Sequence, residues 1–137
     1  MKYQYFIASR WRNRDSVFEL TKKLRQKGKT VYCFMENDPY HSSDDDPEEV
    51  MKAFESTKDW KKTEMLKEIF KKDMDALVQS ETLLLLLPAG KSAHIESGAA
   101  YGMKKKCILI GEQKKAESLY LIFNEDYPSI DAFIANL

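Results

Sequence analysis

Five consecutive leucines at positions 83–87, followed by Pro88, constrain the fold of this chain more than any other feature. The run is too short to cross a bilayer and contains no alternating polar residues, which excludes a membrane-spanning helix and a half-exposed strand. Such a run is typical of a strand that is buried on both faces, as in the centre of a parallel sheet. We therefore expect residues 82–87 to form a central strand that ends at Pro88.

A helix rich in small residues is predicted directly after this strand, over residues 92–103. Ser92 fits its N-cap position, and Gly90 gives the preceding turn its freedom. On a helical wheel Glu96 shares a face with Ala93 and Ala100, and this is the face that packs on the sheet. A carboxylate there either interacts with the helix dipole, worth about 0.3–1 kcal/mol, or is held inward for chemistry. This stretch alone leaves both interpretations open.

The rest of the chain alternates strand and helix patterns, which predicts an α/β fold. The chain is expected to form one domain, residues 1–137, with a single doubly wound parallel sheet of about five strands in flavodoxin-like order. Gly28 ends the first helix. The strands are expected at residues 3–8, 30–35, 82–87, 106–111 and 119–123, and the helices at 14–27, in two pieces over 47–80, at 92–103 and from 127 onward.

Composition excludes several classes of function. The 22 basic and 22 acidic residues balance, so no overall field attracts a nucleic acid polymer or a membrane surface. No signal peptide or membrane span is expected, and Cys33 and Cys107 are predicted to be buried reduced thiols, which favours the cytoplasm. The sequence has no metal-ligand spacing, no GxGxxG after the first strand and no P-loop, so we expect no metal and no cofactor.

Asp73 is the second acidic residue that the pattern singles out. Leu66, Ile69 and Leu77 form an apolar stripe of helical period, and Asp73 lies within it, whereas Asp75 points the opposite way. A carboxylate in an apolar stripe costs stability unless it is paired. Asp73 is therefore a candidate for function, the alternative being a carboxylate at the edge of the stripe that bonds to nearby backbone.

Side chains from several carboxyl ends of strands are expected to meet in one pocket, because open α/β sheets bind ligands at this edge. Tyr5 on the first strand would lie there with Glu96 and Asp73, and two carboxylates beside a phenol suit a reaction at an anomeric carbon. The loops and the helix N-terminus at this edge are expected to bind an anionic part of the substrate, although a solvated basic loop explains the arginines equally well. The predicted substrate-binding residues are Ser9, Arg10, Arg12, Gly90, Lys91 and Ser92.

These motifs resemble those of the nucleoside 2-deoxyribosyltransferases and the related deoxynucleoside 5′-monophosphate N-glycosidases. The resemblance rests on residues 5–9, 73–81 and 90–102 and covers most of the chain. The sequence Glu96-Ser97-Gly98 matches the nucleophile motif of that family. Asp73, eight positions before Glu81, matches an active-site acid, and Tyr5 matches the strand-one tyrosine that orients the nucleophile.

Two positions depart from the family pattern. Glu81 stands where the family usually has aspartate. Gly90, six positions before Glu96, stands where the transferases carry aspartate and the monophosphate hydrolases carry serine. Lys91 or Ser92 would take over from the missing side chain and would suit a phosphate better than a bare 5′-hydroxyl.

The resemblance implies an enzyme that cleaves or transfers the N-glycosidic bond of a (deoxy)nucleoside or nucleoside 5′-monophosphate. Glu96 would attack C1′ to give a covalent glycosyl intermediate, Asp73 would assist proton transfer, and Tyr5 would hold Glu96 in line. A homodimer or larger assembly is implied by the resemblance alone. The alternatives are a catalytically inactive nucleotide-binding or signalling module of the same fold, and a structural domain that serves only as an interaction surface.

Overall fold

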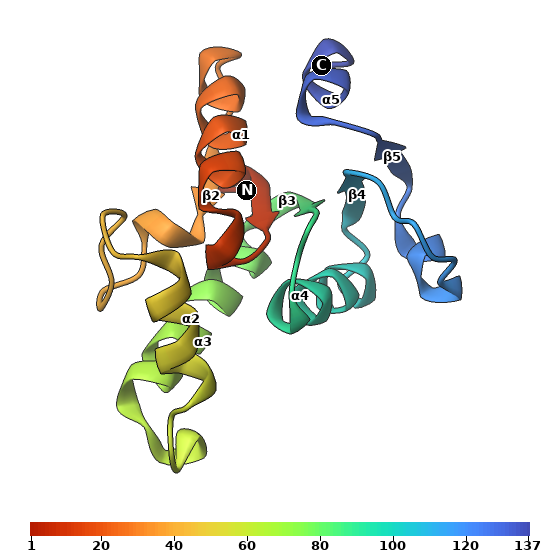
Figure 1. Cartoon of the computed structure of the whole chain (residues 1–137). Helices are drawn as coiled ribbons and strands as arrows, with labels where there is room; N and C mark the ends of the chain where they lie inside the picture. The colour runs from red at the N-terminus through yellow and green to blue at the C-terminus, as the bar shows by residue number, and fades with distance from the viewer.

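One parallel sheet of five strands organises the molecule, in the order β2-β1-β3-β4-β5 (Figure 1). The computed structural model describes all residues from 1 to 137. The sheet order is the flavodoxin-like one, so the predicted fold class is confirmed. The strands are β1 (Tyr3–Ala8), β2 (Val31–Cys33), β3 (Ser80–Leu86), β4 (Lys106–Ile110) and β5 (Glu125–Tyr127).

Five α-helices connect or follow these strands, and several short 3-10 helices lie in the loops. Gly28 ends α1 as predicted: it adopts φ +76°, and the amides of Gly28 and Lys29 donate back to the carbonyls of Arg25 and Leu24. The helices are α1 (Arg14–Gln26), α2 (Pro47–Glu55), α3 (Glu64–Val78), α4 (Lys91–Gly102) and α5 (Ile130–Ala135), and the short 3-10 helices include η1 (Trp11–Asn13) and η4 (Ser118–Ile122).

The leucines of β3 are buried on both faces of the sheet, as the run predicts. Leu84 and Leu86 pack in one core cluster with residues of α1 and α5, whereas Leu83 and Leu85 pack in the other with residues of α3 and α4. We call these two sides the α1/α5 face and the α3/α4 face. Figure 1 shows α1 and α5 above the sheet and α3 and α4 below it.

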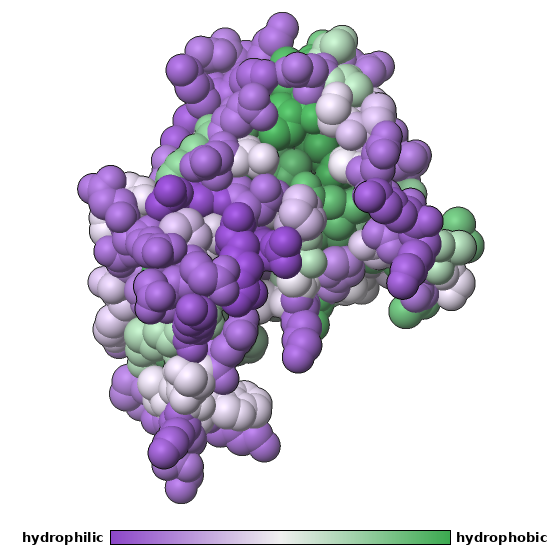
Figure 2. All heavy atoms as spheres, in the orientation of Figure 1, coloured by the Kyte–Doolittle hydropathy of each residue, from purple (hydrophilic) through white to green (hydrophobic).

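The surface is mostly polar in Figure 2, where an apolar strip shows between α1 and α5. Cys33 and Cys107 are free and buried, which confirms the predicted thiols. None of the helices combines the length and the apolarity that crossing a bilayer requires.

The C-terminal part of the chain differs from the prediction. The expected strand at 119–123 is instead the 3-10 helix η4, in which Leu119 and Leu121 are 73% and 88% exposed. The fifth strand is the polar segment Glu125–Tyr127, and α5 begins later than predicted, with Ser129 as its N-cap. β5 pairs with β4 alone and none of its residues is fully buried, so its sequence carries no apolar run.

The second strand and the start of α4 also differ in detail. The predicted strand 30–35 is shortened to Val31–Cys33, because the chain turns into a 3-10 helix at Phe34–Glu36. Gly90, not Ser92, is the N-cap of α4, and no side chain caps this helix. Ser92 is the second residue of α4 and is exposed to solvent.

Candidate active site

Two carboxylic acids lie on neighbouring helices of the α3/α4 face. Glu96 is on α4 and Asp73 is on α3, and both side chains are half-buried. The two helices pack against each other, and the two carboxyl groups are close enough for Asp73 to raise the pKa of Glu96. We call Glu96 and Asp73 the acid pair. The two inward acids predicted from the sequence are therefore brought together.

Glu96 has no basic partner. Burial raises the pKa of Glu96 to about 8, and the negative charge of Asp73 adds to this effect. Both influences oppose ionisation, since a charged carboxylate loses its hydration when buried and is repelled by a second carboxylate. Glu96 is thus mainly protonated at neutral pH in the free protein.

Asp73 is bound by a phenol from β2. The hydroxyl of Tyr32 donates to Asp73 Oδ1 at 2.8 Å. Burial raises the pKa of Asp73 to about 6, assisted by the charge of Asp38, while the Tyr32 hydrogen bond and Lys72 act in the opposite direction. Burial and the charge of Asp73 also raise the pKa of Tyr32, so the phenol remains a hydrogen-bond donor throughout the accessible pH range.

The environments of the two acids push their pKa values apart, which is typical of catalytic carboxyl pairs. Because the groups interact, they titrate as a pair that releases its two protons in separate steps, and burial shifts both steps to higher pH. One carboxyl group can then act as a nucleophile or base while the other carries a proton. This combination is what displacement at a glycosidic carbon requires.

Tyr5 lies on the opposite face of the sheet from the acid pair. Its ring packs on the α1/α5 face, edge-on to Phe133 at 5.9 Å between centroids. The physical reason is the alternation of β1: Phe6 and Ala8 point to the α3/α4 face, so Tyr5 and Ile7 point to the opposite one. The expected contact between Tyr5 and Glu96 is therefore corrected, and the phenol at the acid pair is that of Tyr32.

The sequence contains a feature that indicates a hydrogen-bond partner for Tyr32. It lies within a strand pattern that predicts burial, and a buried tyrosine hydroxyl usually requires a hydrogen-bond partner. Asp73 was the buried acid without an identified partner. The ring of Tyr32 stacks on Phe6 at 5.2 Å between centroids, which positions its hydroxyl on the α3/α4 face.

Ser9 connects the carboxyl ends of β1 and β3. Its hydroxyl is buried and donates to the carbonyl of Leu86 at 2.9 Å. The side-chain amide of Asn13 donates to Ser9 Oγ and to the carbonyl of Leu87. These bonds hold the strand ends together, so Ser9 supports the loops of this edge.

The two arginines after β1 differ in their surroundings. Arg12 forms ion pairs with Glu48 at 2.8 Å and Glu55 at 3.0 Å, so its guanidinium ties η1 to α2 and is not free for an anion. These contacts make Arg12 a link between η1 and α2, and its role in substrate binding stays a prediction. Arg10 is half-buried, and its Nε is a buried nitrogen without a hydrogen-bond partner. Of the two, Arg10 keeps unused hydrogen-bonding capacity.

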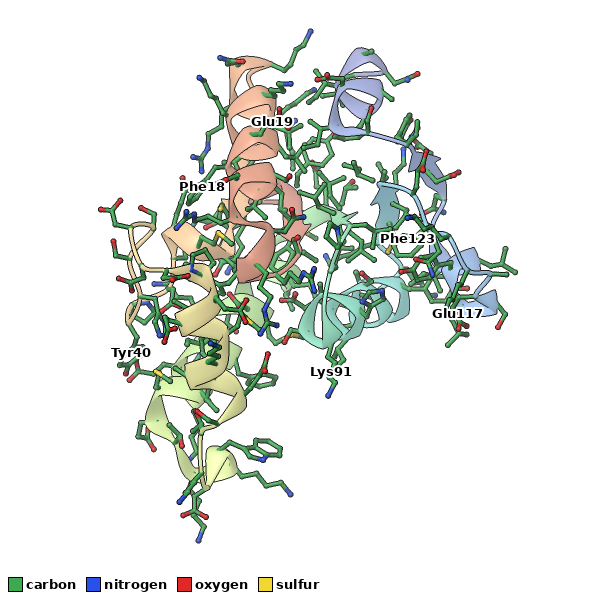
Figure 3. The ribbon with its side chains drawn as sticks, viewed as in Figure 1. Phe18, Glu19, Tyr40, Lys91, Glu117 and Phe123 are labelled. Atoms are coloured by element: carbon green, nitrogen blue, oxygen red, sulfur yellow. The ribbon has the colours of Figure 1, made fainter.

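Gly90, Lys91 and Ser92 form the beginning of α4. Lys91 and Ser92 are exposed, and Figure 3 shows the Lys91 side chain extending away from the helix. A Cβ added to Gly90 would meet no atom within 4 Å, so the backbone leaves room for a β-carbon at this position. The carbonyl of Gly90 accepts from His94 Nδ1 at 2.7 Å. The His94 ring is thereby anchored to the turn.

An open hollow of about 560 Å³ lies beside this turn but includes neither member of the acid pair. His94 and Tyr120 contribute to its wall, and His94 Nε2 lies 2.7 Å from the Tyr120 hydroxyl. The remaining lining residues are Leu87, Pro88, Ala89, Glu112, Gln113, Lys114 and Lys115.

Comparison with known proteins identifies the fold. No family model and no curated protein matches the sequence. Among solved structures, the chain is similar to a 2-deoxyribosyltransferase from Bacillus psychrosaccharolyticus, with a TM-score of 0.71 and 15% identity over 95% of this chain and 89% of that one. It is also similar to the CMP N-glycosidase BcmB of Clostridium botulinum, with a TM-score of 0.52 and 20% identity over 96% of both chains. At these identities the matches establish the fold alone.

Proposed function

We propose that this chain, which has the fold of the nucleoside deoxyribosyltransferases, is an enzyme acting on the N-glycosidic bond of a nucleoside or nucleoside 5′-monophosphate. The observation that carries the proposal is the acid pair: two half-buried carboxyl groups on adjacent helices, with raised pKa values, and with Tyr32 bound to one of them. The two similar structures are a transferase and a hydrolase of such bonds, which supports this reaction class.

In the proposed mechanism, ionised Glu96 attacks C1′ and the bond from C1′ to the base breaks. The oxocarbenium-like transition state carries positive charge, which the acid pair stabilises electrostatically. Asp73, oriented by Tyr32, hydrogen-bonds to the sugar or base and assists proton transfer. A second base then gives transfer, whereas water gives hydrolysis and frees Glu96. General acid catalysis contributes about 10²–10⁴-fold to such rates.

The protonation of the pair sets the pH range of the reaction. Glu96 must lose its proton to act as a nucleophile, and its pKa of about 8 means that this fraction increases as the pH rises from 6 to 8. Ionisation of Glu96 taken alone should make the rate at low substrate concentration increase over this interval. Activity that peaks near pH 5 would contradict the assignment of Glu96.

We also propose that the substrate is a small molecule, that no cofactor takes part, and that the active form is a homo-oligomer. Arg10 is the best remaining candidate for an anionic group of the substrate, because its Nε is buried and unpaired.

The test is release of free base. The purified protein is incubated with deoxynucleosides and with nucleoside monophosphates, and the products are separated by chromatography. Glu96→Gln should abolish release, whereas Glu49→Gln, which changes an exposed glutamate of α2, should leave it unchanged. Base release that persists in Glu96→Gln at the rate of the wild type would refute the mechanism.

A second candidate function is a nucleotide-binding module without turnover, and Gly90 is the observation that favours it. The position lacks the side chain that the resemblance leads one to expect, although there is room for a β-carbon. Stabilisation of the protein by a nucleotide without base release supports this alternative. Gly90→Ser then tests whether the missing side chain is the cause. Base release that appears in this variant shows that the acid pair can catalyse the reaction once a side chain is present at position 90.

A further inference from the structure

A second acid–base group lies on the loop between β2 and α2. The carboxylate of Asp38 accepts from His41 Nδ1 at 2.8 Å and from the backbone amides of Tyr40 and His41. The side chains of Asp38 and His41 are only 5% and 15% exposed. This pairing within a loop depends on the tertiary structure, which buries both side chains.

The ring of His41 is held in one orientation. It packs against Trp11 of η1 at 5.9 Å and against Phe54 of α2 at 5.0 Å between centroids. Because a carboxylate only accepts hydrogen bonds, Nδ1 must carry a hydrogen and Nε2 is the nitrogen that gains or loses a proton. Nε2 makes no hydrogen bond within the chain and is not among the buried unpaired atoms. A histidine oriented through one nitrogen and free at the other is the arrangement of a general acid or base.

Asp38, the hydrogen-bond partner of His41, lies near the acid pair. Asp38 is close enough to Asp73 of α3 for its charge to raise the pKa of Asp73. The loop is also fastened to α3, since the hydroxyl of Tyr40 donates to Glu68 at 2.7 Å, and Figure 3 shows Tyr40 where the loop meets that helix. The loop therefore holds His41 between η1 and α2 on one side and brings Asp38 toward α3 on the other.

We propose that His41, oriented by Asp38, is a further catalytic residue that supplies the proton to the departing base. The proposal rests on the proposed function. It also gives the leaving base a proton donor outside the acid pair, whose Glu96 must be ionised to attack C1′.

The step balances as follows. A carboxylate oxygen of Glu96 forms a bond to C1′, and the bond between C1′ and the base nitrogen breaks with its electron pair going to the base. The Nε2 proton of the His41 imidazolium passes to the base, which leaves neutral. In hydrolysis, water then attacks C1′, the ester bond to Glu96 breaks, and the proton of water returns to His41 Nε2.

The decisive experiment compares leaving bases that do and do not need this proton. Each ordinary base is compared with an activated analogue that leaves more easily: guanine with 7-methylguanine, or uracil with 5-fluorouracil, each as the deoxynucleoside monophosphate. If the wild type releases guanine, the first comparison is used, and if it releases uracil, the second. His41→Asn keeps a donor for Asp38 but has no group that replaces Nε2. We expect it to slow release of the ordinary base by about 10²-fold or more and to leave release of the activated base close to that of the wild type. Asp38→Asn should show the same selectivity with a smaller loss, as expected for a positioning residue.

Asp44→Asn is the matched control, because it changes an exposed aspartate of the same loop whose side chain contacts neither Asp38 nor His41. It should slow neither base, and melting temperatures confirm that each variant is folded. Equal effects of His41→Asn on both bases, or no effect on either, would overturn the role of His41 while Glu96-dependent release upholds the proposed function. A wild type that releases no base at all refutes both proposals.

Discussion

Carboxylates are held in opposite ways in two parts of this molecule. In the part built on η1 and α2, Glu48 pairs with Arg12, and at the edge of the sheet Glu125 pairs with Lys106; these contacts hold the pKa values of both carboxylates below their usual range. On the α3/α4 face, Glu96 and Asp73 have no such partners, and burial raises the pKa values of both. A carboxylate in an ion pair thus stays ionised and holds two elements together. A buried carboxyl group without a basic partner has a pKa closer to neutral pH and can therefore exchange a proton.

The largest difference in the rate of base release is expected between variants of two aspartates of α3, the half-buried Asp73 and the ion-paired Asp75. Asp73→Asn removes the acid that Tyr32 orients, and we expect base release to fall by about 10²–10⁴-fold. Asp75, two residues further along α3, is exposed and paired with Lys71 at 2.5 Å. Asp75→Asn should therefore leave the rate unchanged. Steady-state rates of the two variants make the comparison, and similar losses in both would remove the distinction.

The two tyrosines test the two faces of the sheet. Tyr32→Phe deletes the donor to Asp73 and should slow base release by about ten- to a hundredfold, because a hydrogen bond to a charged group contributes roughly 1.5–3 kcal/mol. Tyr5→Phe should not alter the rate, since its ring lies on the α1/α5 face. A loss in Tyr5→Phe that exceeds the loss in Tyr32→Phe would reverse the assignment.

The pH dependence of stability should reveal the acid pair without any substrate. The pKa of Glu96 is raised from 4.5 to about 8 and that of Asp73 from 3.8 to about 6. Their contribution to stability is therefore complete below their unfolded-state pKa values and is lost as the pH rises through the folded ones. We expect the free energy of unfolding, measured by urea denaturation, to decrease between about pH 4 and 8.

Glu96→Gln is the control for this measurement. Its neutral amide should remove the contribution of Glu96 between about pH 4.5 and 8, so that only the decrease due to Asp73, between about pH 4 and 6, remains. An identical pH profile in the wild type and this variant would show that Glu96 ionises as freely when folded as when unfolded.

The smallest effect on stability and on base release is expected when the ion pairs of Arg12 with Glu48 and Glu55 are broken. Arg12→Gln breaks the contacts of η1 with Glu48 and Glu55, both of which are exposed. Ion pairs at the surface contribute little, so we expect a slight decrease in melting temperature and an unchanged rate of base release. A rate that falls as much as in Asp73→Asn would place Arg12 in substrate binding after all.

The sequence by itself determined the architecture and the two acids. The leucine run at 83–87 predicted a strand buried on both faces, and the alternation of strands and helices predicted the parallel sheet. Asp73 and Glu96 were found because each interrupts an apolar helical face, and periodicity along a helix depends only on local spacing. These features were predictable since hydrophobic patterning is a property of neighbouring residues.

Only the tertiary structure decided which side chains meet. Tyr32 and Asp73 are 41 positions apart, and their hydrogen bond depends on the order of β2 and β1 and on where α3 packs across them. The same holds for Arg12, whose partners on α2 made it a structural residue, and for His41, whose ring is enclosed by η1 and α2. Contacts between distant segments arise from packing in three dimensions, and no periodicity in the sequence encodes them.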